Sequence, residues 1–89
     1  MPEREVRIVN KLGIHARPAA EIVKTAGKFK SNIIIIRDDL EVNAKSIMGV
    51  MMLAAGKGAK ITLETAGPDE TQAMDEICAL IGDFFGEGQ

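Results

Sequence analysis

The residues best suited to carry out chemistry are His15, Ala16 and Arg17, which stand at the start of a predicted helix. A neutral imidazole nitrogen is a nucleophile near neutral pH, and the backbone N–H groups of a first helical turn attract anions. The guanidinium of Arg17 suits phosphate oxygens. These residues predict a histidine that accepts a phosphoryl group beside the Ala16 backbone N–H. From the residues alone, however, a lone histidine near a helix start is more often a surface or capping residue than a nucleophile.

A metal site at His15 is disfavoured by the composition of the chain. His15 is the only histidine and Cys78 the only cysteine. Zinc sites in proteins draw on several such ligands, and a lone cysteine forms no internal disulfide. We therefore expect neither a metal nor another cofactor, and we interpret Cys78 as a buried small side chain.

Ser46 is a second chemical candidate, because it precedes a short apolar segment. Its hydroxyl suits a helix N-cap, a role worth ~1 kcal/mol. A phosphate on Ser46 would meet the helix N-terminus and Lys45, and its charge would repel acidic partners. The sequence therefore predicts a cap that also serves as a regulatory site.

The apolar segment after Ser46 is too short to bury every side chain. We expect Val50 and Leu53 to pack in the core. Three of the other apolar side chains are predicted to form a partner-docking surface next to His15, because flexible methionines adapt to several partners. The predicted docking residues are Ile47, Met48 and Met51, together with Ala20 and Lys24 of the preceding helix.

Periodicity predicts the elements that position these residues, in the order βαββαβα. The predicted strands cover residues 5–9, 32–37, 40–43 and a segment in which Ile61 and Leu63 face inward, broken by Gly67-Pro68. The predicted helices run from Ala16 to a left-handed stop at Gly27, from Ser46 to about Leu53, and onward from a cap at Asp69. An α+β fold with one helix-covered sheet follows. Strand order stays open, and a ferredoxin-like arrangement with an extra helix fits equally well.

Two helices have a predicted buried face. In the first, that face comprises Ala19, Ala20, Val23 and Ala26. In the last, it comprises Ala73, Ile77, Leu80, Ile81 and Phe84. Such stripes at helical spacing are typical of helices packed on a sheet.

Composition narrows the class of protein further. The chain has 89 residues, 46% of them hydrophobic, which predicts a single domain over residues 1–89. The net charge of −2 and the absence of a Lys/Arg block argue against a nucleic-acid partner. The charged N-terminus is unlike a signal peptide, and the longest aliphatic run, Ile33 to Ile36, is too short to cross a bilayer. We expect a cytoplasmic protein that is not bound to a membrane.

Two segments resemble the signatures of a known family. Residues 13–19, Gly-Ile-His-Ala-Arg-Pro-Ala, resemble the active-site signature of the HPr family. Residues 45–51, Lys-Ser-Ile-Met-Gly-Val-Met, resemble its second signature. The resemblance implies a histidine-containing phosphocarrier of the phosphoenolpyruvate-dependent phosphotransferase system. It also implies an open-faced β-sandwich, a four-stranded antiparallel sheet with three helices on one face.

The resemblance further implies partners and roles. Enzyme I would phosphorylate Nδ1 of His15, Arg17 would support the phosphoryl group, and an EIIA domain would receive it, usually for sugar uptake. Ser46 would be the target of an HPr kinase/phosphorylase, and the modified form would engage a transcriptional regulator. The chain would be a monomeric covalent carrier rather than a turnover enzyme.

Three alternatives remain. A nitrogen-branch or regulatory paralogue would use the same histidine with a different EIIA. A binding module with the same fold would never carry phosphate, but such family members lack the histidine. A small-molecule-binding regulatory domain would leave the run from His15 to Pro18 without a purpose.

Overall fold

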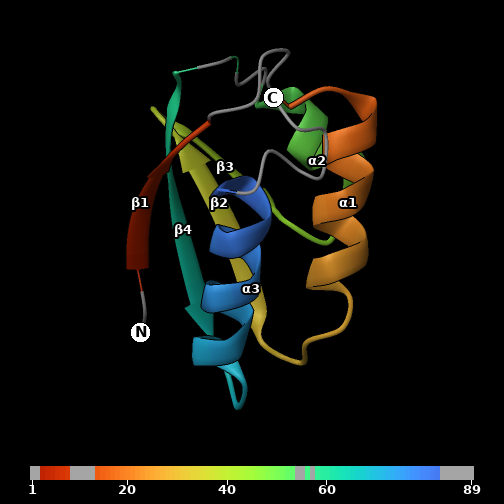
Figure 1. Ribbon diagram of the computed structural model, residues 1–89, viewed down its shortest axis with the longest axis vertical. Coiled ribbons are helices and arrows are strands. Elements are labelled where there is room, and N and C mark those ends of the chain that lie inside the picture. The colour runs from red at the N-terminus through yellow and green to blue at the C-terminus, as the bar shows by residue number, and fades with distance from the viewer. Residues whose placement is uncertain (1–2, 9–13, 54–55, 57, 83–89) are drawn as a thin grey trace.

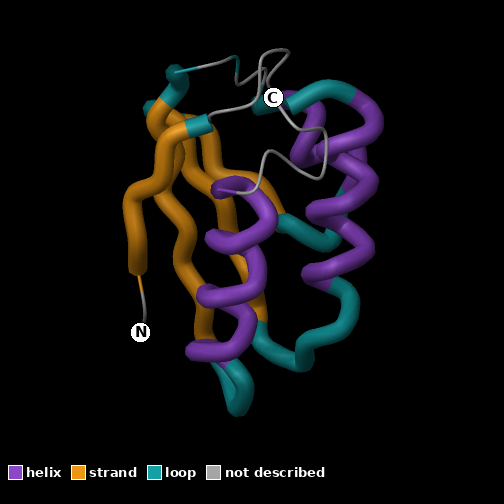
Figure 2. Tube along the Cα trace, in the orientation of Figure 1, coloured by secondary structure: helices purple, strands orange, loops and turns teal. Residues whose placement is uncertain are grey.

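The structure, a computed structural model, describes residues 3–8, 14–53, 56 and 58–82. Its strands are β1 (Glu3–Arg7), β2 (Asn32–Arg37), β3 (Leu40–Asn43) and β4 (Lys60–Ala66). Its helices are α1 (Ala16–Ala26), α2 (Ile47–Met52) and α3 (Glu70–Gly82). The strands form one antiparallel sheet, and the helices cover one face of it (Figures 1 and 2). The predicted element order and layer arrangement are confirmed.

The strand order of the sheet is β1-β4-β2-β3, and every neighbouring pair is antiparallel. Among the described residues, the first strand therefore lies at an edge of the sheet and pairs only with β4. A ferredoxin-like sheet places its first strand in the interior, so that alternative is wrong. Alternation along a strand reveals which side chains face inward, but not which strand lies next to it.

The core lies between the sheet and the helices. Alternate residues of the two central strands face the helices and are buried: Ile33 and Ile35 of β2, and Ile61, Leu63 and Thr65 of β4. The inward orientation predicted for β4 is confirmed. Burial of each large aliphatic side chain contributes roughly 1.5–3 kcal/mol.

The buried face of α1 differs from the predicted one. Ala19 and Ala26 are buried, but Ala20 is exposed, Val23 is only half-buried, and Ile22 is fully buried. Steps of three and four residues join positions 19, 22 and 26 into one stripe, and Ala20 lies about 100° away from Ala19 on the helix.

The buried face of α3 largely agrees with prediction. Ala73, Ile77 and Ile81 are buried as predicted, and Met74 joins them. Leu80 is only partly buried, and Phe84 lies outside the described residues.

The end of α1 corrects a second prediction. Gly27 has φ −64° and ψ −16°, a right-handed conformation, so no left-handed stop is formed. The helix instead closes with tight turns, in which the Lys28 N–H donates to the Thr25 carbonyl at 3.1 Å and the Phe29 N–H donates to the Ala26 carbonyl at 3.2 Å. These bonds use the last carbonyls of the helix, so a left-handed residue is not needed.

The other predicted boundaries agree more closely. The bounds of β2 and β3 are confirmed, and Asp38-Asp39 forms the turn between them, with Asp38 left-handed at φ 54°. The first strand starts earlier than predicted, and the buried Ile8 follows it. Val9 lies outside the described residues.

The start of α3 is closed by side chains from within the chain. The Asp69 carbonyl accepts from the Ala73 N–H at 3.0 Å, which confirms the predicted helix start. The Asp69 carboxylate turns toward the loop after α1, where it accepts from the Ser31 hydroxyl, the Lys30 N–H at 3.0 Å and the Ser31 N–H at 2.9 Å. The Ser31 hydroxyl bond, followed by the Lys30 N–H bond, lowers the pKa of Asp69 to about 2.

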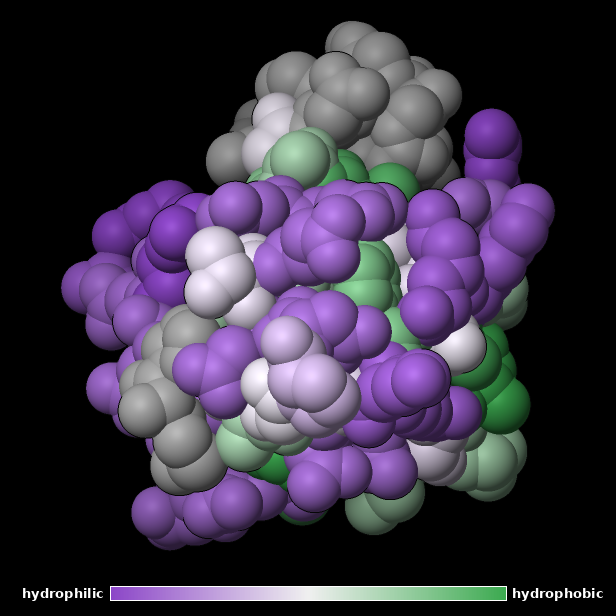
Figure 3. All heavy atoms as spheres, turned by 90° about the horizontal axis from the view of Figure 1, so that it is seen from below, coloured by the Kyte–Doolittle hydropathy of each residue, from purple (hydrophilic) through white to green (hydrophobic). Residues whose placement is uncertain are grey.

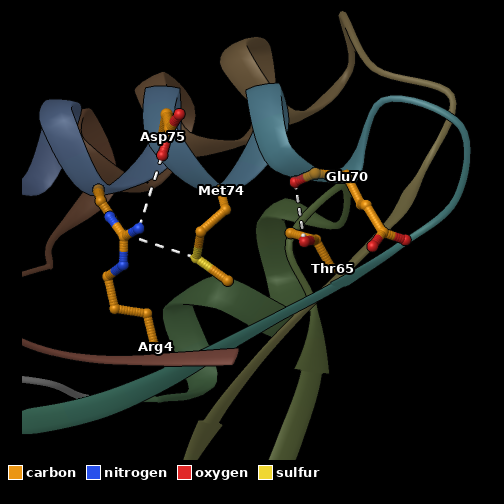
Figure 4. Close-up of polar contacts among 6 residues, drawn as sticks. Arg4, Thr65, Glu70, Met74 and Asp75 are labelled. Atoms are coloured by element: carbon orange, nitrogen blue, oxygen red, sulfur yellow. Dashed lines mark hydrogen bonds and ion pairs between the residues drawn. The ribbon is translucent and has the colours of Figure 1, made fainter. Parts of the chain in front are cut away.

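Further contacts complete this junction. The Thr65 hydroxyl donates to the Glu70 carbonyl at 2.9 Å, and the Glu70 carboxylate accepts from the Gly67 N–H at 3.0 Å. Farther along α3, Arg4 of β1 pairs with Asp75 at 3.6 Å (Figure 4). Seen from the side where α3 begins, the surface is mainly hydrophilic (Figure 3).

Candidate functional site

The start of α1 has the geometry predicted for a phosphoryl acceptor. His15 precedes the helix with an extended backbone (φ −109°, ψ −167°), and its carbonyl accepts the first helical hydrogen bond, from the Ala19 N–H at 2.9 Å. Ala16 and Arg17 thus contribute the N–H groups that a helix start leaves without an intrahelical acceptor. Pro18 has no N–H to leave unpaired. The turn therefore directs two backbone donors toward its open end.

The electrostatics of this turn favour an anion. His15 is half-buried, whereas Ala16 and Arg17 are exposed. No acidic side chain lies in the first turn of α1, all of which the structure describes. Within the described part of the chain, the His15 side chain makes no capping hydrogen bond to that turn. The first turn of α1 therefore combines the positive end of the helix dipole with the exposed Arg17, and it contains no carboxylate.

Ser46 occupies the predicted N-cap of α2. Its backbone is extended, and its hydroxyl oxygen accepts from the Gly49 N–H at 3.2 Å. The Ser46 side chain is exposed, so the same oxygen is accessible to a modifying enzyme. In the unmodified protein Lys45 Nζ donates to the Phe29 carbonyl at 2.8 Å, so a contact between Lys45 and a phosphate on Ser46 stays a prediction.

The residues of α2 divide as predicted into buried and exposed groups. Val50 and Leu53 are buried. The exposed fractions of the other large apolar side chains are 38% for Ile47, 70% for Met48, 44% for Met51 and 64% for Met52. These four residues are called the apolar surface below. No role was predicted for Met52. Its exposure follows from the shortness of α2, because a six-residue helix with one buried residue cannot bury all its apolar side chains.

The apolar surface and His15 lie on neighbouring elements. Helix α2 packs against α1 near the end where α1 begins (Figure 1). Ala20 and Lys24, the α1 residues predicted to bind partners, are both exposed. Lys28 lies farther along and pairs with Glu76 of α3 at 3.2 Å, which directs its charge away from α2. All five predicted docking residues are thus accessible.

Other features do not compete with this site. Within the described residues, no group of three or more His, Cys, Asp or Glu side chains is arranged to hold a metal ion. A hollow lined by Ile34 and Glu64 lies on the sheet rather than beside α1. Gly13, part of the first signature, lies outside the described residues. None of the helices in the described ranges has both the length and the apolarity that a membrane crossing requires.

Comparison with known proteins links this geometry to a phosphocarrier family. The family model described as "PTS HPr component phosphorylation site" matches residues 2–83. Phosphocarrier protein HPr of Cupriavidus necator is 55% identical over 89 residues, the full length of both chains. The crystal structure of HPr-C-His from Thermoanaerobacter tengcongensis matches with a TM-score of 0.94 and 47% identity, covering 98% of each chain. An HPr dimer from the same organism matches with a TM-score of 0.79 and 47% identity, covering 98% of this chain and all of that one.

Proposed function

This chain belongs to the HPr family of phosphocarrier proteins of the phosphotransferase system, and from that premise we propose that His15 accepts a phosphoryl group from phosphorylated enzyme I and passes it to an EIIA domain. The observation that carries the proposal is the start of α1. There His15 stands beside the exposed Ala16 and Arg17, in a turn without acidic residues.

The transfer chemistry follows from these groups. The lone pair of His15 Nδ1 attacks phosphorus, and an N–P bond forms while the bond between phosphorus and enzyme I breaks. In this proposal the Ala16 N–H and the Arg17 guanidinium stabilise negative charge on the phosphoryl oxygens. In the second step the same N–P bond breaks as an EIIA group attacks. Phosphoryl transfer depends mainly on positioning and charge stabilisation, so this small set of groups suffices.

Partner recognition is assigned to the surface beside His15. The apolar surface, with Ala20 and Lys24, presents a flexible apolar centre next to a positive charge. Such a surface fits several partners in turn, especially acidic ones. We assign the chain to the cytoplasm as a single HPr-like domain that works as a monomer and a covalent carrier rather than as a turnover enzyme. Because an HPr dimer is known from Thermoanaerobacter tengcongensis, the oligomeric state of this chain should be measured in solution.

Regulation is assigned to Ser46. Phosphorylation of its exposed hydroxyl by an HPr kinase/phosphorylase would place a phosphate at the N-terminus of α2, where the Ser46 oxygen now accepts from the Gly49 N–H. It would also add about two negative charges between Lys45 and the apolar surface. Docking of acidic partners would weaken, and a transcriptional regulator would gain a phosphoserine to recognise.

The deciding experiment measures intact mass after incubation with enzyme I, Mg²⁺ and phosphoenolpyruvate. The wild type should gain one acid-labile phosphoryl group, and His15→Ala should gain none. Ser46→Ala serves as the matched control and should still be phosphorylated. No gain on the folded wild type would remove the carrier assignment in favour of a binding module.

The same phosphorylated protein identifies the branch of the system. It is mixed separately with purified EIIA domains for sugars and with a nitrogen-branch EIIA. Transfer to a sugar EIIA supports sugar uptake, whereas transfer only to the nitrogen-branch domain assigns the chain to that paralogue.

A further inference from the structure

The apolar surface lies on a helix that is too short to be stable on its own. Helix α2 has six residues, and isolated helices much longer than this are already marginal in water. Val50 is its one buried residue, and Leu53 is buried directly after it. The four exposed side chains therefore depend on other contacts for a fixed position.

One such contact lies at the C-terminal end of α2. Leu53 ends the helix, and its carbonyl accepts from Arg37 Nη1 at 2.8 Å. Arg37 is the last residue of β2 and is half-buried. A helix leaves its last carbonyls without intrahelical donors, and a cation at this end also complements the dipole. Arg37 thus joins the end of α2 to the sheet.

A matching contact lies before the N-terminal end. Lys45 stands next to the Ser46 cap, and its Nζ donates to the Phe29 carbonyl at 2.8 Å. Phe29 is a buried residue just after α1. The Lys45 backbone N–H is also held, by the Asn43 side chain at 2.9 Å. Lys45 thus joins the start of α2 to the segment that follows α1.

We propose that Arg37 and Lys45 are positioning residues for the apolar surface, each fixing one end of α2 through a charged hydrogen bond to a backbone carbonyl. Hydrogen bonds from charged donors are about twice as strong as neutral ones. With both bonds in place, α2 is tied to the sheet at one end and to the α1 side at the other. The proposal rests on the proposed function in one respect, that partners dock on this surface.

Hydrogen exchange of the unphosphorylated protein tests the positioning directly. Arg37→Met and Lys45→Met remove the cation and keep an apolar stem. The amides of α2 should exchange about tenfold faster in each variant, as expected for one lost hydrogen bond to a charged group. Exchange in α1, β2 and β4 should stay close to that of the wild type. Lys45→Arg, which keeps a cation, should recover most of the protection.

Arg7→Met is the matched control. Arg7 Nη1 donates to the Gly58 carbonyl at 3.0 Å, so the bond has the same chemistry but does not involve α2. This variant should leave exchange in α2 unchanged. If Arg7→Met accelerates α2 as strongly as the other two variants do, the effect is general loss of stability and the proposal fails.

Phosphorylation kinetics with enzyme I test the consequence for docking. Arg37→Met and Lys45→Met should raise the KM for this protein several-fold and leave kcat within about twofold, because binding rather than the transfer step is affected. A raised KM without faster α2 exchange would mean that these side chains touch the partner directly, and would overturn the positioning role. Faster exchange with an unchanged KM would overturn it as well.

The two proposals fail in different ways. If the wild type is not phosphorylated, the proposed function fails, while hydrogen exchange still reports whether the two residues hold α2. If the wild type is phosphorylated and the variants match it in both measurements, only the positioning role is lost.

Discussion

The two long helices pack on the same sheet, yet their N-termini are built in opposite ways. At the start of α3, Asp69 and Glu70 supply the negative charge, and both carboxylates accept hydrogen bonds from within the chain. At the start of α1 the first turn, described throughout, holds no acidic residue, and Ala16 and Arg17 are exposed. Both starts carry the same positive dipole. At α3 the positive end of the dipole is neutralised by Asp69 and Glu70, whereas at α1 it remains available to an external anion such as a phosphoryl group.

The surroundings of the two helix starts differ in the same sense. The end where α3 begins is mainly hydrophilic (Figure 3). Beside the start of α1 lies the apolar surface, where Met48 and Met52 are more than half exposed. Burial and bonding at the first end serve stability, whereas exposure at the second leaves room for a partner. The start of α1 is therefore accessible because its first turn lacks the acidic residues that close the start of α3.

The largest effect should come from adding a side chain at Gly67, where the backbone packs closely against Ser31 before the α3 start. Gly67 has φ 148°, and a Cβ there would lie 2.6 Å from Ser31 Oγ and 2.7 Å from Ser31 Cα. Gly67→Ala should therefore cost ~3 kcal/mol or more in the free energy of unfolding. Denaturant titration measures this, with Gly82→Ala as control, since nothing lies within 4 Å of a Cβ at Gly82. A cost below ~1 kcal/mol would show that the junction is not tightly packed.

Ser31 at the α3 start and Ser46 at the α2 start should contribute different amounts to the free energy of unfolding. Ser31 is buried and both donates to and accepts from Asp69, so Ser31→Ala should cost ~2 kcal/mol. Ser46 is exposed and caps α2 alone, so Ser46→Ala should cost ~1 kcal/mol. Thermal and denaturant unfolding of both variants give the order. Equal costs would weaken the contrast between a closed and an open end.

An acid placed at the start of α1 should make it resemble that of α3. Ala16→Asp should stabilise the protein by ~0.3–1 kcal/mol through the helix dipole. The same carboxylate should slow phosphorylation of His15 by enzyme I about tenfold, through repulsion of the incoming phosphoryl group. Ala16→Asn controls for side-chain size without the charge. Unchanged phosphorylation with higher stability would show that the missing acid has no functional role.

The smallest effect concerns the pH dependence of stability. The pKa of Asp69 falls from 3.8 to about 2 in the folded protein, so its contribution is complete above pH 4 and is lost as the pH falls toward 2. Asp69→Asn should lack that part of the acid-induced loss. Unfolding titrations of both proteins from pH 6 to pH 2 give the two profiles. Parallel profiles would mean that Asp69 is not held by Ser31 and Lys30 in solution.

Local patterns in the sequence were sufficient for much of this molecule. The run of β-branched residues from Ile33 to Ile36 and the turn at Asp38-Asp39 predicted both strands of the β2–β3 hairpin with their exact bounds. The start of α1 at Ala16 and the cap at Ser46 also followed from neighbouring residues alone. These features depend on interactions over a few positions, which a sequence displays directly.

Features that depend on distant segments could not be predicted in this way. Alternation in β4 gave its buried face but not its place between β1 and β2. The acceptors of Arg37 and Lys45 are backbone carbonyls 16 residues away, and every residue has a carbonyl. Gly27 shows the converse error, since a glycine after a helix often adopts a left-handed conformation but does not need to.

The position of β1 at the edge of the sheet also bears on how the protein is made. Within the described part of the chain, its residues 3–7 pair only with β4, at residues 60–64, so during synthesis the first strand has no strand partner until residues 60–64 have been added. At about 5–20 residues per second, that delay is roughly 3 to 12 seconds on the ribosome. Four of the five residues of β1 are charged, namely Glu3, Arg4, Glu5 and Arg7. The charges of β1 therefore reduce its tendency to aggregate during the time in which it has no strand partner.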